Sequence, residues 1–114
     1  MINFKNETLD SIKKYGKTEN EILFIGTFDY KVSIQDFWGL SDFDYDNSFG
    51  AQHIPEDLIV VFDDFSWLER QEYDGSESWV FYKAPVLPRD TRKIKRIYNK
   101  GYLTLAETQL EPRE

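Results

Sequence analysis

Apolar and polar positions along the first third of the chain predict one helix followed by two strands. The helix is expected to be capped by Thr8 and to end just before Gly16, because the apolar residues between them follow helical spacing. The apolar runs at residues 22–25 and 28–32 are typical of strands, and Gly26 marks the bend between them.

A second short helix is predicted to run through Leu40. Ser33 and Asp36 have the spacing of a residue pair that caps the start of a helix. Residues 42–56 follow, and we interpret them as irregular because glycine and proline interrupt any regular period. Regular structure is expected to resume at residue 58.

The clearest strand in the sequence covers residues 58–62. All five residues are apolar, and such an unbroken run is typical of a strand that is buried on both faces. The pattern therefore predicts a central position in a sheet.

Residues 66–83 are predicted to form a hairpin whose turn is Asp74-Gly75, a strong signal for a two-residue turn. That turn would place Glu72 opposite Glu77, and the repulsion between the two charges costs roughly a few tenths of a kcal/mol. A longer loop would relieve this repulsion, so the sequence leaves the register open.

The last third of the chain allows two interpretations. Residues 93–98 and 102–106 fit a second hairpin, which we favour, although the apolar spacing in 93–98 also suits a helix. Together the elements predict an α+β fold, a mainly antiparallel sheet with one or two short helices. We expect residues 1–107 to form a single domain and residues 108–114 to be a loose tail.

Composition adds limits on class and compartment. The chain has 114 residues, of which 40% are hydrophobic and 17% aromatic, so it can bury a substantial core. It contains no cysteine, which excludes disulfides and thiolate metal sites. Neither a membrane-spanning apolar run nor the layout of a signal peptide occurs, so we predict a soluble, cytoplasmic protein without a membrane partner.

Charge divides the chain into a negative centre and a positive segment. Residues 36–77 contain twelve acidic residues and a single base, Arg70, whereas residues 83–100 contain seven bases and one acid. One interpretation is that the two regions lie beside each other in the fold and partly neutralise each other. Alternatively, the acidic centre can meet a basic groove on another protein, because complementary potentials steer association. The basic segment is too short to predict direct nucleic-acid binding.

The acidic centre supplies the candidate binding residues. In an extended segment, alternate side chains share one face about 7 Å apart, close to the phosphate spacing of a nucleic-acid strand. Acids at such positions can replace nucleic acid in a basic channel, with interleaved aromatics as apolar anchors. The opposing interpretation is that the aromatics are core and the acids simply solvated. The candidates are Asp42, Phe43, Asp44, Tyr45, Asp46, Phe49, Asp63, Asp64, Glu69 and Glu72.

No catalytic constellation is predicted. His53 is the single histidine, and its position beside Pro55 is typical of a loop residue. No phosphate-binding loop, dinucleotide fingerprint or zinc pattern occurs, so we expect no cofactor and no metal. A small metal-dependent enzyme that uses Asp63, Asp64 and Glu69 is the weakest alternative.

Three segments, residues 41–52, 57–61 and 67–79, resemble a group of small proteins encoded by bacteriophages and prophages. The resemblance covers about residues 30–85 and carries over no catalytic residue. Small acidic phage proteins include inhibitors of host defences, among them anti-CRISPR proteins. The resemblance therefore implies a non-enzymatic inhibitor of a nuclease or CRISPR effector. An immunity protein against a toxin nuclease is the alternative.

Overall fold

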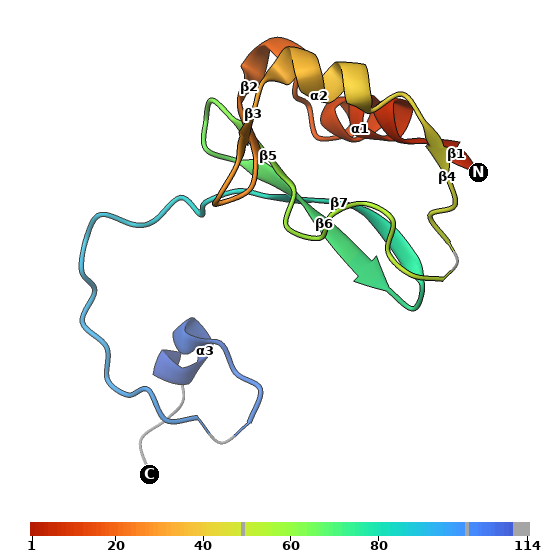
Figure 1. Ribbon diagram of the computed structural model, residues 1–114. Coiled ribbons are helices and arrows are strands. Elements are labelled where there is room, and N and C mark those ends of the chain that lie inside the picture. Colours follow the sequence, from red (N-terminus) through yellow and green to blue (C-terminus); the bar gives the residue numbers. More distant parts are fainter. Residues whose placement is uncertain (49, 100, 111–114) are drawn as a thin grey trace.

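The computed structural model describes residues 1–48, 50–99 and 101–110 and confirms an α+β fold built mainly on antiparallel sheet (Figure 1). Within these residues, five strands form a sheet in the order β3-β2-β5-β6-β7, and β1 pairs separately with β4. The strands are β1 (Ile2–Asn3), β2 (Ile22–Gly26), β3 (Lys31–Val32), β4 (Asp44–Tyr45), β5 (Ile59–Phe62), β6 (Trp67–Tyr73) and β7 (Ser76–Tyr82). The helices are α1 (Phe4–Lys14), α2 (Ile34–Leu40), α3 (Leu105–Leu110) and a 3-10 helix, η1 (Glu19–Glu21). Across the described ranges, no helix has the length and hydrophobicity needed to cross a bilayer.

Helix α1 begins earlier than the sequence suggested. Asn3 is its cap, and the Asn3 side chain accepts a hydrogen bond from the Asn6 backbone N–H at 3.0 Å. The prediction that Thr8 caps the helix is wrong, because Thr8 lies inside α1 and is fully buried. The end of the helix was predicted well: Gly16 follows it with φ 73° and bonds back to the Lys13 carbonyl.

The second predicted helix and the first two strands are confirmed. Ser33 caps α2, and its hydroxyl accepts a hydrogen bond from the Asp36 backbone N–H at 3.0 Å. Strand β2 pairs antiparallel with β3, although β3 covers only two residues of the predicted run 28–32. The interval at 42–56 is mostly irregular but contains β4.

Strand β5 occupies the centre of the five-stranded sheet, as predicted. Only one of its faces is fully buried. Val60 and Phe62 have no exposed surface and belong to the core with residues of α1 and α2. Ile59 and Val61 on the other face remain half-buried, because both helices pack on the first face. The prediction of burial on both faces is therefore wrong for this second face.

The hairpin β6–β7 has the predicted two-residue turn, and of the registers that the sequence left open it adopts the one in which Tyr73 faces Ser76. Asp74 and Gly75 both have positive φ, 51° and 84°, as the favoured hairpin turn requires. Glu72 does stand opposite Glu77, but the repulsion is relieved because Glu77 is buried in an ion pair with Arg70.

The predicted second hairpin does not form. Residues 93–99 and 101–104 contain no strand, and the chain is helical at α3 instead. The Gln109 side chain of α3 bonds the backbone of Lys95 and Arg96, which provides partners that a strand ladder would otherwise supply. Helix α3 also includes residues 108–110 of the predicted tail, and residues 111–114 lie outside the described residues.

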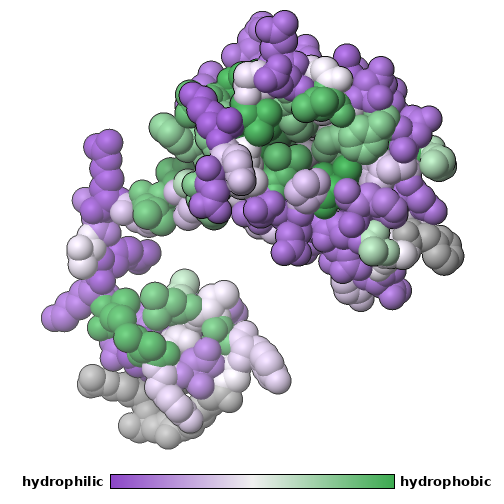
Figure 2. All heavy atoms as spheres, in the orientation of Figure 1, coloured by the Kyte–Doolittle hydropathy of each residue, from purple (hydrophilic) through white to green (hydrophobic). Residues whose placement is uncertain are grey.

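Residues 83–99 and 101–110, here called the C-terminal arm, extend away from the sheet and the first two helices (Figure 1). The radius of gyration is 20.0 Å, against about 13 Å for a compact chain of this size. Figure 2 shows apolar side chains on this arm as well as on the body. The arm thus carries its basic and apolar residues outside the main core.

Candidate functional site

Two of the predicted acids are held side by side at the β1–β4 pair. Asn3 is the register partner of Asp44, and its side-chain amide donates to Asp42 Oδ1 at 2.8 Å and to Asp44 Oδ1 at 3.3 Å. Both carboxylates are exposed. One neutral amide therefore holds two negative charges close together, although they repel each other. We call Asp42, Phe43 and Asp44 the acidic edge.

Phe43, between the two acids, packs its ring against the core but remains partly exposed. Its ring stacks on Phe4 with centroids 5.5 Å apart, and 41% of the residue remains accessible. Tyr45, the other predicted anchor, is only 4% exposed and lies in the core. The core interpretation thus holds for Tyr45, whereas Phe43 offers apolar surface beside the acids.

Beneath this edge lies a buried polar network around Arg70, whose side chain has no exposed surface. Arg70 bonds the Tyr45 hydroxyl at 2.9 Å, Glu77 at 3.0 Å and Glu7 at 3.2 Å. The Tyr45 hydroxyl in turn donates to Glu7. Burial, with the bond to Glu7, raises the pKa of Tyr45 well above its usual range. The single base of residues 36–77 is therefore buried and paired within the fold.

Glu77 is the buried acid of this network. Burial alone would raise its pKa, but hydrogen bonds from the His53 backbone, Arg70 and the Ile54 backbone together lower the pKa below its usual value. The His53 backbone N–H donates to Glu77 at 2.7 Å, and its ring nitrogen lies 3.9 Å from the same carboxylate. His53 thus belongs to a loop that is tied to β7, in agreement with its interpretation as a loop residue.

The acids near the hairpin tip are engaged in local turns. Asp46 is exposed and accepts a hydrogen bond from the Ser48 backbone at 3.0 Å. Glu72 is exposed and accepts one from the Gly75 backbone at 2.7 Å. The candidate anchor Phe49 lies outside the described residues.

At the other end of β6, Asp63 and Asp64 lie in the turn that follows β5. The Asp64 carboxylate pairs with Lys17 and accepts hydrogen bonds from Ser66, and these interactions hold its pKa below the usual range. The charge of Asp64 is thus matched within the fold. Asp63 remains exposed, and its backbone N–H bonds the Glu21 carbonyl at 2.8 Å.

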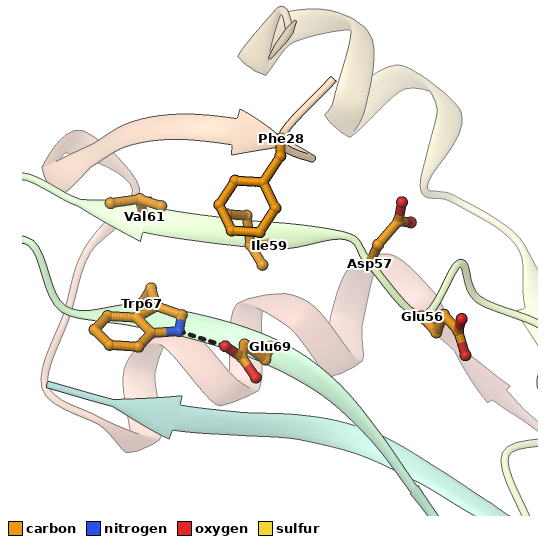
Figure 3. A pocket seen from close by; sticks show the side chains of 7 residues that line it. All are labelled: Phe28, Glu56, Asp57, Ile59, Val61, Trp67 and Glu69. Atoms are coloured by element: carbon orange, nitrogen blue, oxygen red, sulfur yellow. Dashed lines mark hydrogen bonds between the residues drawn. The ribbon is translucent and has the colours of Figure 1, made fainter. Parts of the chain in front are cut away.

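Glu69 lies on the open face of the sheet, beside an apolar hollow of about 440 Å³ (Figure 3). Trp67 Nε1 donates to Glu69 at 2.9 Å. Figure 3 shows Phe28 projecting over the strand that carries Ile59, with two further acids at one end of the hollow. The lining residues are Phe28, Glu56, Asp57, Ile59, Val61, Trp67 and Glu69.

A second hollow of about 500 Å³ adjoins the first, because both are lined by Glu56 and Asp57. Its other lining residues come from β6 and from the loop before β5: Gln52, Arg70, Gln71 and Glu72. We call the two hollows together the acidic groove. Sequence reasoning did not select Glu56 and Asp57 as site residues, because they fall in the irregular interval and only the fold brings them to Glu69.

The predicted acids therefore do not form one surface. The structure places them at the acidic edge, at the hairpin tip and groove, and in the turn after β5. Of the candidates for metal chemistry, Asp63 and Asp64 lie in the turn after β5 and Glu69 lies on β6, and Asp64 is already paired with Lys17. Among the residues that the structure describes, no group of three or more His, Asp or Glu side chains is arranged to hold a metal ion.

We compared the chain with protein-family models, with curated proteins and with solved structures, and none of the three comparisons found a match. The functional argument therefore depends on the residues themselves. Two surfaces stand out: the acidic edge on the β1–β4 pair and the acidic groove on the open face of the sheet.

Proposed function

We propose that this protein is a non-enzymatic inhibitor that binds the basic, nucleic-acid-binding surface of a nuclease, in the manner of an anti-CRISPR protein. The acidic edge is its primary contact. Its carboxylates meet lysine and arginine side chains that otherwise bind phosphates, and Phe43 supplies an apolar anchor between them.

The observation that carries this proposal is the shared amide of Asn3. Asp42 and Asp44 are exposed, close together and oriented by one neutral donor. Two fixed like charges are unfavourable in the free protein, and a cation from a partner would relieve their repulsion. A binding surface of this kind is ordered before the partner arrives, which lowers the cost of association.

The turn after the edge extends the same charge pattern. Asp46 follows directly on β4 and is exposed. Exposed charges of one sign accelerate encounter with a basic groove, and salt screens that effect. Binding through the edge should therefore weaken steeply as ionic strength rises.

The test is charge reversal with a matched control. The variant Asp42→Lys, Asp44→Lys, Asp46→Lys should lose partner binding by at least about tenfold, or about 1.4 kcal/mol, with a nearly unchanged melting temperature. The control Asp10→Lys, Glu19→Lys, Asp29→Lys alters the net charge equally at exposed positions elsewhere. It should bind almost normally.

The partner is found by affinity capture from host cells with the wild-type chain, read by mass spectrometry. The wild type and the control should capture a nuclease, and the edge variant should not. Equal capture by the edge variant would remove this surface from the mechanism. Capture of a secreted toxin nuclease would make the protein an immunity protein instead of a defence inhibitor.

A further inference from the structure

The open face of the sheet carries an apolar surface that α1 and α2 leave uncovered. Phe24, Val61, Trp67 and Tyr82 follow one another across four strands in register. The rings of Trp67 and Tyr82 stack at 5.6 Å, and exposed Phe28 projects over the same face. Of these aromatic side chains, Trp67 and Phe28 form the apolar floor and wall of the first hollow of the acidic groove.

The rim of this groove is acidic. Glu56, Asp57 and Glu69 line the first hollow, and Glu56, Asp57 and Glu72 line the second. An occupant that matches both parts must combine apolar side chains with cations. Aromatic grooves of this kind are a recurrent binding site for extended proline-containing segments, whose stiff backbone loses little entropy on binding.

The second hollow also offers a free strand edge. The Glu77 backbone N–H donates to the Asn47 carbonyl on the outer side of β7, so the backbone polar groups of Glu77 point away from β6. Glu72 faces Glu77 in the register, so the backbone polar groups of Glu72 point away from β7. Because this direction repeats every second residue, those of Arg70 point to the same side of β6. β5 pairs only with residues 67–69 of β6, so the edge at 70–73 has no strand beside it in the described part of the chain.

The chain itself contains a segment that fits such a groove. The sequence Pro85-Val86-Leu87-Pro88-Arg89 places two prolines three residues apart, a spacing typical of polyproline II ligands. Val86 and Leu87 are 100% and 73% exposed. Two further bases, Arg92 and Lys93, follow within four residues and are also exposed.

The C-terminal arm runs away from the sheet of its own chain. It begins directly after Tyr82, at the edge of its own groove, and Pro85 fixes an extended backbone there. A sharp reversal onto the same groove is thereby disfavoured. Two side-chain hydrogen bonds join the arm to itself: Gln109 bonds the Arg96 carbonyl, and Asn99 bonds the Leu103 carbonyl.

We propose that two copies of this chain exchange their C-terminal arms, so that Pro85–Arg89 of each copy lies in the acidic groove of the other. Val86 and Leu87 fill the space beside Trp67, while Arg89, Arg92 and Lys93 meet the carboxylates of the groove. The exchange is reciprocal, so the interface is closed and self-complementary. The acidic edge lies on other elements and stays free, so this inference does not rest on the proposed function.

Cross-linking tests the exchange, and the absence of native cysteine makes it clean. One chain carries Ile59→Cys in the groove, and a second chain of different mass carries Leu87→Cys in the arm. Mixing the two under oxidation should give a disulfide-linked heterodimer. The control chain carries Leu40→Cys, which is 76% exposed on α2, and it should cross-link far less.

A chain with both Ile59→Cys and Leu87→Cys separates the remaining outcomes. Covalent dimers confirm exchange. Internally bridged monomers would overturn it, because they would show that the arm folds back on its own groove. A lack of any cross-link above the Leu40→Cys control would also overturn it, since the arm would then be occupied elsewhere or free.

Sedimentation provides a second readout. Wild-type chain should form dimers that dissociate with added salt. Glu56→Lys with Asp57→Lys should weaken dimerisation about tenfold or more, and so should Arg89→Glu with Arg92→Glu. An equimolar mixture of the two variants should regain dimerisation through both arm contacts, because the native arm meets the native groove and the reversed arm meets the reversed groove. A wild type that stays monomeric at every concentration tested would contradict the proposal.

Discussion

The indole of Trp79 donates a hydrogen bond to the Thr8 hydroxyl at 2.9 Å and thereby links strand β7 to helix α1. The two residues are 71 positions apart and both are buried. The Thr8 hydroxyl in turn donates a hydrogen bond to the Phe4 carbonyl at 2.8 Å. Each polar atom of this contact is therefore satisfied inside the core.

Removing either partner should destabilise the fold. Thr8→Val keeps the shape but leaves the Trp79 N–H unpaired, so it should lower the free energy of unfolding by about 1–3 kcal/mol. Trp79→Ala also creates a cavity and should cost about 3–5 kcal/mol. Urea denaturation measures both, with exposed Thr91→Val as the control. A Trp79→Ala chain of normal stability that no longer binds its partner would instead make Trp79 an interface anchor.

The same contact explains where sequence reasoning succeeded and failed. The turn of the β6–β7 hairpin was predicted correctly because its signal is local to Asp74-Gly75, whereas the sequence left the register open. Thr8 was mistaken for a helix cap because cap residues and buried hydroxyls look alike in sequence. Only packing against β7, far along the chain, decides between the two roles.

The candidate site shows the same division. The alternation of acids at 42–46 correctly predicted that Asp42 and Asp44 lie close together. It did not reveal that Lys17 neutralises Asp64, since 47 residues separate the two. Likewise, the groove at Glu56 depends on which face of the sheet the helices cover, and no local pattern specifies that choice.

The Arg70 network should be the most sensitive polar feature. Arg70→Leu removes the cation that serves Glu7 and Glu77 and leaves two carboxylates without a charged partner. We expect a loss of about 3–5 kcal/mol in the free energy of unfolding, measured by urea denaturation. Exposed Lys31→Leu is the control and should change it by less than about 0.5 kcal/mol. A small effect of Arg70→Leu would show that water compensates the carboxylates.

Acid should weaken the fold through Glu77. Its pKa in the folded chain lies below the ordinary value of 4.5, so its stabilising effect is complete above pH 4.5 and is lost as the pH falls through the folded pKa. Glu77→Gln should be less stable at pH 7 but should lose less stability than wild type between pH 5 and pH 3. Asp64 contributes equally to both chains, so the difference isolates Glu77. Parallel pH profiles would refute this role.

Two glycines should respond oppositely to the same change. At Gly26, with φ 155°, an added Cβ would lie 1.9 Å from the Tyr30 carbonyl oxygen, so Gly26→Ala should open the β2–β3 turn and cost about 2 kcal/mol or more. Gly39 lies in α2 with open space around it. Gly39→Ala should stabilise by about 0.5–1 kcal/mol. Thermal unfolding compares them directly, and equal effects would contradict the clash.

If the acidic edge is held against its own repulsion, neutralising one acid should stabilise the free protein. Asp44→Asn leaves the hydrogen bond between Asn3 and Asp42 in place and removes one of the two adjacent charges. The free energy of unfolding should rise by a few tenths of a kcal/mol, more at low salt than at high salt, because screening already weakens the repulsion there. Asp29→Asn, at an exposed turn position, is the control and should show no such salt-dependent gain. Unfolding curves at 20 mM and 500 mM salt decide the matter, since an Asp44→Asn variant that is less stable at both would mean that the carboxylate serves the fold and is not reserved for a partner.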